Sequence, residues 1–354
     1  MILHYFRKCS CSDLLPTKLH ALPSPYFQLG ASSNLADLKN IFYEASGLLP
    51  NEIGFMELFW TRESPNSCQP YNEVINIPEE AKIFILYKKQ TCSTEDHSYS
   101  VVAILIKNAL QPDILQSMED LLFSSVLPRI KFAPRGSTDA FQGCDCNKRT
   151  EAGGTKSFGC ARCKINPKVC KFYKLSKIEE RGRKQYDLQG RGRVNDPDLK
   201  KLIDTAADIT SVNMEKFAPV AFSNLLNHAQ KGRECIIGSA STKIFGGITI
   251  VSDYSAHLHR DAFDLPQGAV GIISFKNPRK IETQFHALPH YVSNPNNAPG
   301  VCFDPGHNSL LLEVAVHEDH ASTFLKHPDS KNPSRIALVL YRHESLDKPN
   351  HGAL

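Results

Sequence analysis

The sequence has no apolar run long enough to cross a membrane, so a membrane-spanning protein is not expected. Its first residues, MILHYFRKCSC, lack the apolar segment and cleavage site of a secretory signal. Internal repeats and low-complexity tracts are absent as well, which argues against a repeat array. The net charge of +4 permits a nucleic-acid partner but does not indicate one. These absences predict an intracellular protein in a reducing compartment, with no membrane partner.

The composition is that of a soluble globular protein. Charged residues make up 22% of the 354 residues, and hydrophobic residues make up 41%. A chain of this length can bury a sizeable core, either as one large domain or as two ordinary ones. Any indication of function must therefore come from particular residues.

Cysteine is the residue type that stands out. The chain has 11 cysteines, several of them in close pairs, although disulfides are rare in reducing compartments. The pairs favour zinc binding over scattered core thiols, but their spacing is not that of an ordinary zinc finger. The ligands of each site must then come from distant parts of the chain. The cysteines are Cys9, Cys11, Cys68, Cys92, Cys144, Cys146, Cys160, Cys163, Cys170, Cys235 and Cys302.

The first half of the chain predicts a mixed α/β region followed by a cysteine-dense one. Asn34–Ser46 has the cap and apolar stripe of a helix, and Lys82–Lys88 and Tyr99–Ile106 have the composition of strands. A second helix is predicted at Asp113–Phe123. Lys131–Tyr173 has little hydrophobic periodicity, so metal binding is the natural way to order it.

The second half predicts one helix followed by a β-rich region. The charged segment Lys177–Lys201 is either a phosphate-contacting stretch or a solvated linker, and Pro197–Phe217 is predicted as a helix. Short strands between turns rich in Pro, Asn and Gly suggest a sandwich or jelly roll. The predicted strands are Ile248–Tyr254, Ala269–Phe275, Ser309–His317 and Arg335–Arg342.

The stretch GITIVSDYSAHLHRD contains the pattern that suggests chemistry. His259 and Asp261 are two residues apart, so an extended chain presents both on one side, as in a facial 2-His-1-carboxylate iron site. Such a pair is a weak signal in a chain with 14 histidines. His320 is a candidate third ligand far along the chain. Arg335 begins a strand whose inner face it shares with Tyr341, where an arginine needs an anion such as 2-oxoglutarate.

The order of these residues, together with longer motifs, resembles the TET (ten-eleven translocation) methylcytosine dioxygenases. The motifs are FGGITIVSDYSAHLHRD, KFAPVAF, RECIIG, SFGC, QFHALPHY and FLKHPDSKNPSRIALVLYRHESLDKPNHG. The resemblance implies a β-rich α+β fold, with a double-stranded β-helix of the jelly-roll or cupin type. It implies a cysteine-rich zinc-binding region at 1–175 that wraps onto a dioxygenase domain at 176–354. The long low-complexity insert of animal members is absent.

The resemblance also implies the residues of the catalytic site. Fe(II) would bind His259, Asp261 and His320. The co-substrate 2-oxoglutarate would contact Arg335 and His286, with Arg135 as a further candidate. The target base would meet Asp264, His343 and Tyr341.

Three zinc sites are implied by the same resemblance. Each joins distant segments, so zinc would attach the cysteine-rich region to the β-helix. Because His257 would bind zinc while His259 binds iron, the chain must bend between them. The first site comprises Cys68, Cys144, Cys146 and His257; the second comprises Cys160, Cys170, Cys235 and His351; the third comprises Cys9, Cys11 and His97, with Tyr99 at the expected fourth cysteine and Cys92 as a substitute.

Three positions depart from the family pattern. Asp264 stands where the family has an asparagine; its carboxylate can accept from the cytosine amino group but donates to N3 only when protonated. Ala337 replaces a serine that helps to hold 2-oxoglutarate. The loop 161–167 lacks the aromatic and methionine residues that contact DNA in the family.

The leading prediction is a nuclear, monomeric dioxygenase that oxidises 5-methylcytosine in DNA, using Fe(II), 2-oxoglutarate and O2, with Zn(II) as a structural metal. Products beyond 5-hydroxymethylcytosine are implied only by the resemblance. Two alternatives stay open. The same fold could act on another methylated base, on RNA or with another co-substrate, or the chain could be a zinc-stabilised nucleic-acid-binding module without turnover.

Overall fold

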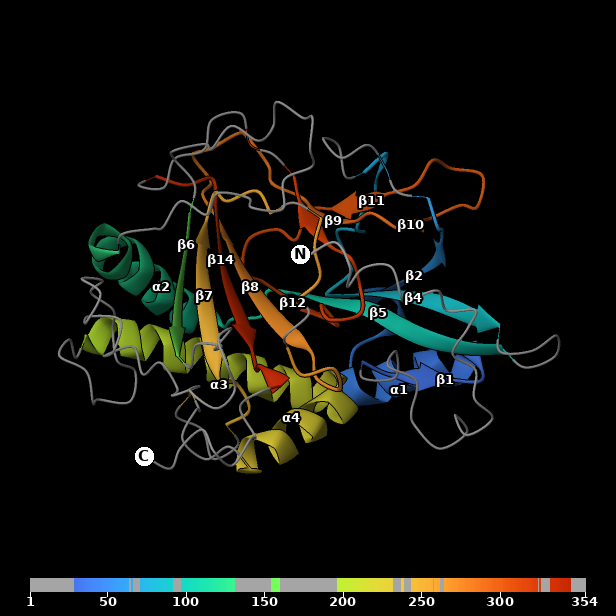
Figure 1. The fold of residues 1–354 in the computed structure, drawn as a ribbon, viewed down its shortest axis with the longest axis horizontal. Helices are drawn as coiled ribbons and strands as arrows, with labels where there is room; N and C mark the ends of the chain where they lie inside the picture. The colour runs from blue at the N-terminus through green and yellow to red at the C-terminus, as the bar shows by residue number, and fades with distance from the viewer. Residues whose placement is uncertain are drawn as a thin grey trace, which may run out of the picture.

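Two β-sheets, with helices along one side of the larger sheet, form the described part of the chain (Figure 1). The computed structural model describes residues 29–63, 65, 71–91, 97–130, 154–159, 196–231, 237–238, 243–256, 258–261, 264–323, 325 and 332–344.

The larger sheet has ten strands in the order β10-β2-β4-β5-β12-β8-β14-β7-β6, with β1 paired to β5. Strands from the first 110 residues and from the last 110 therefore share one continuous sheet, joined where β12 pairs with β5. The strands are β1 (Ala31–Ser32), β2 (Ile53–Trp60), β4 (Ile83–Thr91), β5 (His97–Lys107), β6 (Gly154–Gly159), β7 (Gly247–Ser252), β8 (Val270–Lys276), β10 (Tyr291–Val292), β12 (Ser309–Glu313) and β14 (Arg335–Tyr341).

The smaller sheet has four strands in the order β13-β9-β11-β3. From β7 onwards the chain moves repeatedly between the two sheets: β8, β12 and β14 belong to the larger sheet, and β9, β11 and β13 to the smaller. This alternation is the double-stranded β-helix arrangement that the sequence predicted. The strands are β3 (Glu73–Val74), β9 (His286–Leu288), β11 (Val301–Phe303) and β13 (Ala321–Ser322).

The helices cover the larger sheet on one side (Figure 1). Helix α1 begins where the Asn34 side chain accepts a hydrogen bond from the Ala36 amide, and it ends at Gly47, whose φ of 66° is left-handed. The helices are α1 (Leu35–Ser46), α2 (Pro112–Glu119), α3 (Pro197–Phe217) and α4 (Pro219–Lys231), with short 3-10 turns at Pro50–Glu52 and Leu127–Arg129 and a π-helical segment at Asp120–Val126.

Helix α3 packs directly on β8 and β14. Asp196 caps it by accepting from the amides of Asp198 and Leu199. A Cβ added at Gly271 in β8 would lie 2.2 Å from Cγ2 of Thr210 in α3, so this close approach requires a glycine. The helix thus fixes the strand beside the one that begins with Arg335.

Strand β14 divides its side chains between two hydrophobic cores. Ile336, Leu338 and Leu340 face the core that includes the helices. Ala337 and Tyr341 face the core between the two sheets. The predicted period-two alternation is therefore confirmed, and the face that begins with Arg335 points between the sheets, where the site lies.

Several predicted elements need correction. The second helix was predicted at Asp113–Phe123, but α2 ends at Glu119 and the chain continues as a π-helical segment to Val126. The predicted strand Ser309–His317 is wrong beyond Glu313, because the chain turns there: the amides of His317 and Glu318 both donate to the Val314 carbonyl. Strand β2, helix α4 and the strands of QFHALPHY were not predicted. Strand β6 was not predicted either, because it lies within Lys131–Tyr173, where hydrophobic periodicity is weak.

No helix in the described ranges is both long and apolar enough to span a bilayer. The division into regions 1–175 and 176–354 stays a prediction.

Candidate metal centre and its surroundings

His259, Asp261 and His320 form a cluster whose ligand atoms all lie within 4.8 Å of one another. Nε2 of His259 is 3.8 Å from Oδ1 of Asp261, and Nε2 of His320 is 3.9 Å from Oδ2. The two imidazole rings are 4.3 Å apart between centroids. Two histidines and one carboxylate gathered on one side form the donor set of a facial iron site. The structure thus brings together the three residues predicted as iron ligands.

Backbone hydrogen bonds hold this cluster in place. His259 and His320 form an antiparallel bridge in which each amide donates to the other's carbonyl at 3.0 Å. The bridge extends the smaller sheet beyond β13. The Asp261 amide donates to the Ala315 carbonyl at 3.0 Å, which fixes the third member of the cluster.

The imidazole of His320 has a defined proton position. Its Nδ1 lies 3.1 Å from the Glu318 carbonyl oxygen, which can only accept a hydrogen bond. Nδ1 therefore carries a proton, so in the neutral imidazole that a metal binds the lone pair lies on Nε2, which faces the cluster. This is the tautomer that a metal ligand needs.

The cluster is open on one side. The His259 and Asp261 side chains are 41% and 37% exposed, whereas the His320 side chain is 9% exposed. A large substrate can therefore approach from the side of His259 and Asp261.

Arg335 is a buried cation with an incomplete set of partners. Its Nη2 donates to the Ser274 hydroxyl at 2.9 Å, while its backbone amide donates to Asp253 at 2.9 Å. Nε is buried and has no hydrogen-bond partner among the described residues. Burial lowers the pKa of Arg335 to about 10, so the guanidinium stays charged at neutral pH. A buried charged donor without a partner fits an anionic ligand.

His286 pairs with a carboxylate that the sequence analysis missed. Its Nε2 lies 2.9 Å from Oε2 of Glu313, although the angle falls outside hydrogen-bond geometry. Both side chains are buried, at 5% and 2% exposure. Burial alone would raise the pKa of Glu313, but the charges of His286, His320 and His259 outweigh it and lower this pKa to about 2. Glu313 is therefore ionised at neutral pH.

A second imidazole–carboxylate pair lies next to Asp261 of the cluster. Nδ1 of His343 is 2.9 Å from Oδ1 of Asp264, again outside hydrogen-bond geometry, and the two residues form a backbone bridge. Burial raises the pKa of Asp264 to about 6; His343 opposes this shift and the charge of Asp261 adds to it. The Asp264 amide donates to the Asp261 carbonyl, so this pair is tied to the metal cluster.

Tyr341 packs against this second pair. Its ring centroid is 4.8 Å from that of His343, and its hydroxyl accepts from Thr249 at 3.4 Å. A Cβ at Gly247 would lie 2.8 Å from Cε2 of Tyr341, so the first residue of β7 must be small for the ring to lie there. Three predicted base-contacting residues, Asp264, His343 and Tyr341, are thus neighbours.

Arg342 and His228 fix the chain on either side of His343. Nε of Arg342 donates to Nδ1 of His228 at 2.7 Å. The proton of this imidazole must then be on Nε2, which donates to the Glu344 carbonyl at 3.0 Å. Helix α4 therefore anchors both neighbours of His343.

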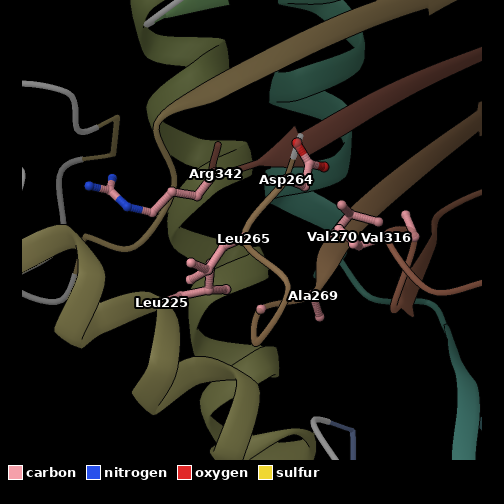
Figure 2. Close-up of a pocket in the computed structure, with 9 residues that line it drawn as sticks. Leu225, Asp264, Leu265, Ala269, Val270, Val316 and Arg342 are labelled. Carbon is pink, nitrogen blue, oxygen red and sulfur yellow. The ribbon is translucent and has the colours of Figure 1, made fainter. Parts of the chain in front are cut away.

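A small pocket lies beside this anchor, between α4 and the segment that follows Asp264. Figure 2 shows Leu225 and Leu265 close to each other while the Arg342 side chain extends away from the group. Its lining is mainly apolar and contains none of the three residues of the metal cluster. The pocket therefore separates Asp264 from α4 and does not itself form the metal centre.

The remaining predicted site residues fall outside what the structure describes. His97 lies in β5, but nothing of its side chain is described. The others are Arg135 and all other predicted zinc ligands, namely Cys9, Cys11, Cys68, Cys144, Cys146, Cys160, Cys170, Cys235, His257 and His351, together with the substitute Cys92.

Cys302 is a free cysteine of the described residues. It is fully buried and unpaired, and burial raises the pKa of its thiol to about 12. Such a thiol is unreactive.

Residues 179–344 match the family described as the Tet_JBP oxygenase domain of the 2OGFeDO superfamily. This segment contains all three residues of the metal cluster, both imidazole–carboxylate pairs and Arg335. The matched segment thus includes helices α3 and α4 and the part of the fold that moves between the two sheets.

Relatives with established names match most of the chain. Methylcytosine dioxygenase TET2 of Mus musculus is 25% identical over 307 residues, which is 82% of this chain and 16% of the relative. Methylcytosine dioxygenase TET of Drosophila melanogaster is 23% identical over 304 residues, covering 80% of this chain and 10% of the relative. The chain therefore spans a small part of the length of these proteins.

Among solved structures, NgTET1 in complex with 5mC DNA aligns with 89% of this chain and 91% of that chain. The sequence identity is 12% and the TM-score is 0.47.

Proposed function

We propose that this chain, whose residues 179–344 match the Tet_JBP oxygenase domain, is an Fe(II)- and 2-oxoglutarate-dependent dioxygenase of the TET family that oxidises 5-methylcytosine in DNA to 5-hydroxymethylcytosine. The observation that carries the proposal is the cluster of His259, Asp261 and His320, together with the buried Arg335 of β14, whose Nε has no partner among the described residues. The relatives named above are methylcytosine dioxygenases, which supports the same substrate.

The three residues of the cluster would hold Fe(II). When bound, the metal together with 2-oxoglutarate and O2 supplies the oxidising chemistry, while the protein contributes orientation and exclusion of water. The fixed tautomer of His320 and the bridge to His259 keep both Nε2 atoms directed at Asp261. The exposed side of the cluster leaves room for the base.

The co-substrate would be held by Arg335. Its unpartnered Nε can donate to a carboxylate, and Ser274 orients the guanidinium by accepting from Nη2. Ala337 lies directly opposite Ser274 in the register of β14 and β8. Ser274 thus supplies a hydroxyl next to the position where the family serine is missing. His286 would be the second contact, with Glu313 behind it.

The target base would lie between the metal cluster and the pair of Asp264 and His343, with Tyr341 beneath its ring. A base stacked inside a duplex cannot bring its methyl group to the metal centre, so it has to be flipped out of the duplex. With a pKa of about 6, Asp264 is protonated in part of the molecules near neutral pH, and the protonated form can donate to N3.

Further oxidation to the formyl and carboxyl forms, a nuclear location, a monomeric state and the three zinc sites complete the proposal. They rest on the resemblance of the sequence alone.

The direct test is mass spectrometry of a methylated duplex after incubation with the protein, Fe(II) and 2-oxoglutarate. We expect 5-hydroxymethylcytosine from the unaltered protein and none from His320→Ala, with equal zinc content in both. Glu80→Gln, which changes an exposed acid far along the chain, is a control that should keep full activity. A correctly folded protein that produces no oxidised cytosine would refute the proposal.

A second candidate keeps the chemistry and changes the substrate. Asp264 in place of asparagine presents a carboxylate where the family reads the base, which favours another methylated base or an RNA as the alternative. Comparing methylated DNA with methylated RNA, each with and without 2-oxoglutarate, distinguishes the two. Binding of DNA without consumption of 2-oxoglutarate would instead indicate a module without turnover, which the complete cluster disfavours.

A further inference from the structure

Two acidic residues precede His320, and each is held by a separate set of side chains. We call Glu318 and Asp319 the acidic pair. We propose that the acidic pair positions His320 for metal binding, by holding the Glu318 carbonyl that accepts from the His320 imidazole. The inference rests on the proposed role of His320 as an iron ligand.

Glu318 is held inside the protein by Lys88 and Tyr291. Its Oε1 is 2.9 Å from Nζ of Lys88, and its Oε2 accepts from the Tyr291 hydroxyl at 2.5 Å. Nζ of Lys88 also donates to the same hydroxyl at 2.8 Å, which closes a triangle. The Lys88 and Glu318 side chains are only 8% and 7% exposed, and Tyr291 is fully buried. Burial lowers the pKa of Lys88, and the carboxylate of Glu318 opposes this.

Asp319 is held by two other side chains, those of Arg260 and His290. Arg260 donates from Nε to Oδ1 at 2.8 Å and from Nη2 to Oδ2 at 2.7 Å, which is a bidentate pair. Nε2 of His290 lies 3.2 Å from Oδ2 of Asp319, and its Nδ1 lies 3.3 Å from the Glu63 carbonyl. Because both partners of His290 only accept hydrogen bonds, both of its nitrogens carry protons. Its hydrogen bond to Asp319 raises the pKa of His290 accordingly.

These contacts join the same segments as the metal ligands. Arg260 lies between His259 and Asp261, so its pair with Asp319 reinforces the backbone bridge from His259 to His320. His290 and Tyr291 are consecutive residues that contact Asp319 and Glu318, respectively. The side chains on both sides of the peptide bond between residues 318 and 319 are therefore fixed.

The consequence for His320 follows from its hydrogen bond. The Glu318 carbonyl belongs to this fixed peptide unit, and it sets both the tautomer and the rotation of the imidazole. Outer partners of this kind orient metal ligands in many proteins. Lys88 comes from β4, so a strand of the first half of the chain contributes to the geometry of the metal centre.

The test uses Co(II) as a spectroscopic substitute for Fe(II), with the full chain and no 2-oxoglutarate. We expect Glu318→Gln and Asp319→Asn each to raise the dissociation constant for Co(II) by about 10- to 100-fold, the usual range for outer partners of metal ligands. We also expect the visible absorption of bound Co(II) to change, because the ligand orientation changes. Tyr291→Phe removes only a hydroxyl, so it should change the Co(II) dissociation constant and the visible spectrum in the same direction but to a smaller degree.

The control is Glu80→Gln, an exposed acid on the turn before β4, which should leave the affinity and the spectrum unchanged. Thermal unfolding of every variant separates loss of fold from loss of orientation. A purely structural role would lower the unfolding temperature and leave the Co(II) spectrum and affinity of the folded fraction as they are, which would overturn the inference.

The unaltered chain and His320→Ala distinguish this inference from the function on which it rests. If the unaltered chain binds Co(II) and His320→Ala abolishes binding, the proposed metal centre holds. Normal binding by Glu318→Gln and Asp319→Asn would then refute the positioning role alone. Failure of the unaltered chain to bind Co(II) would refute the metal centre and this inference with it.

Discussion

Two imidazole–carboxylate pairs lie near the metal cluster, and the pKa values of their carboxylates differ although the spacing within each pair is the same. Glu313 with His286 and Asp264 with His343 are each 2.9 Å apart, and both carboxylates are buried. The pKa of Glu313 is lowered to about 2, whereas that of Asp264 is raised to about 6. Distance to the partner and depth of burial therefore do not decide which carboxylate stays ionised.

The difference comes from the next neighbours. Glu313 lies near three imidazoles, those of His286, His320 and His259, whose combined charges favour the ionised form. Asp264 lies near Asp261, a second carboxylate, which adds to the effect of burial. A carboxylate behind a proposed anion-binding histidine is thus kept charged, and a carboxylate beside a proposed base is kept close to neutrality.

The largest expected effect is on stability, and it comes from a change in the pair of Glu313 and His286. Glu313→Gln removes a buried charge and leaves His286 without its counterion, so we expect a loss of about 3 kcal/mol in the free energy of unfolding at neutral pH. Because the pKa of Glu313 is lower in the folded state than in the unfolded one, its contribution is present above about pH 4.5 and is lost as pH falls towards 2. Urea unfolding of both proteins at pH 7 and pH 3 measures this.

The difference in the free energy of unfolding between Glu313→Gln and the unaltered protein should be smaller at pH 3 than at pH 7. Glu80→Gln serves as the control, since that exposed acid should show no such difference at either pH. Equal stability of Glu313→Gln and the unaltered protein at neutral pH would mean that Glu313 does not carry a stabilising charge.

The second pair predicts a smaller effect, on the pH dependence of activity. If the protonated form of Asp264 donates to the base, the rate should fall by up to about tenfold per pH unit as pH rises above the pKa of about 6. Asp264→Asn has a permanent donor of similar size, so its rate should not fall in this range. Initial rates on a methylated duplex between pH 6 and pH 8 distinguish the two.

The Asp264→Asn variant must retain the Co(II) affinity of the unaltered protein, because residue 264 contacts Asp261 through its backbone amide, which the substitution leaves in place. If the rates of the unaltered protein and of Asp264→Asn fall equally as pH rises, a group other than Asp264 sets the pH dependence.

How much of this site could be predicted from the sequence depends on how many positions separate the residues that contact one another. The ligands His259 and Asp261 and the inner face of β14 were predicted because two-residue spacing has a direct consequence in an extended chain. His320 was a candidate third ligand before any resemblance was considered, whereas the roles of His286 and the base-contacting residues came from the resemblance to a family. For the described part of the chain, the structure brings these residues together.

Other residues had no such signal. Lys88 and Glu318 are 230 positions apart, and nothing local in either segment indicates the pairing. Glu313 lies in the apolar run SLLLEV, where a single acid among buried residues could have marked it as functional. In the same way, no short-range pattern indicates that Ser274 lies opposite Ala337, because the register of β8 and β14 is set by the whole sheet.

The smallest and most specific predicted effect comes from Ser274, which contacts Arg335. Arg335 is near Glu313, whose charge raises the pKa of the guanidinium that burial lowers. Ser274→Ala removes the acceptor of Arg335 Nη2, so the guanidinium loses its orientation but keeps its charge. We expect the KM for 2-oxoglutarate to rise about fivefold, corresponding to the ~1 kcal/mol of one hydrogen bond, with kcat nearly unchanged. Steady-state kinetics with varied 2-oxoglutarate at saturating DNA measures both.

The neighbouring strand offers a matched control for this change. Ser309 of β12 lies opposite Ser274 and is also buried, but its hydroxyl donates to the Gly306 carbonyl and not to Arg335. Ser309→Ala should therefore leave the KM for 2-oxoglutarate unchanged, because it removes a buried hydroxyl of the same size without touching the guanidinium. Equal KM values for the two variants would mean that Ser274 has no part in orienting Arg335. A fall in kcat for Ser274→Ala alone would instead place its hydroxyl in the reaction and not in co-substrate binding.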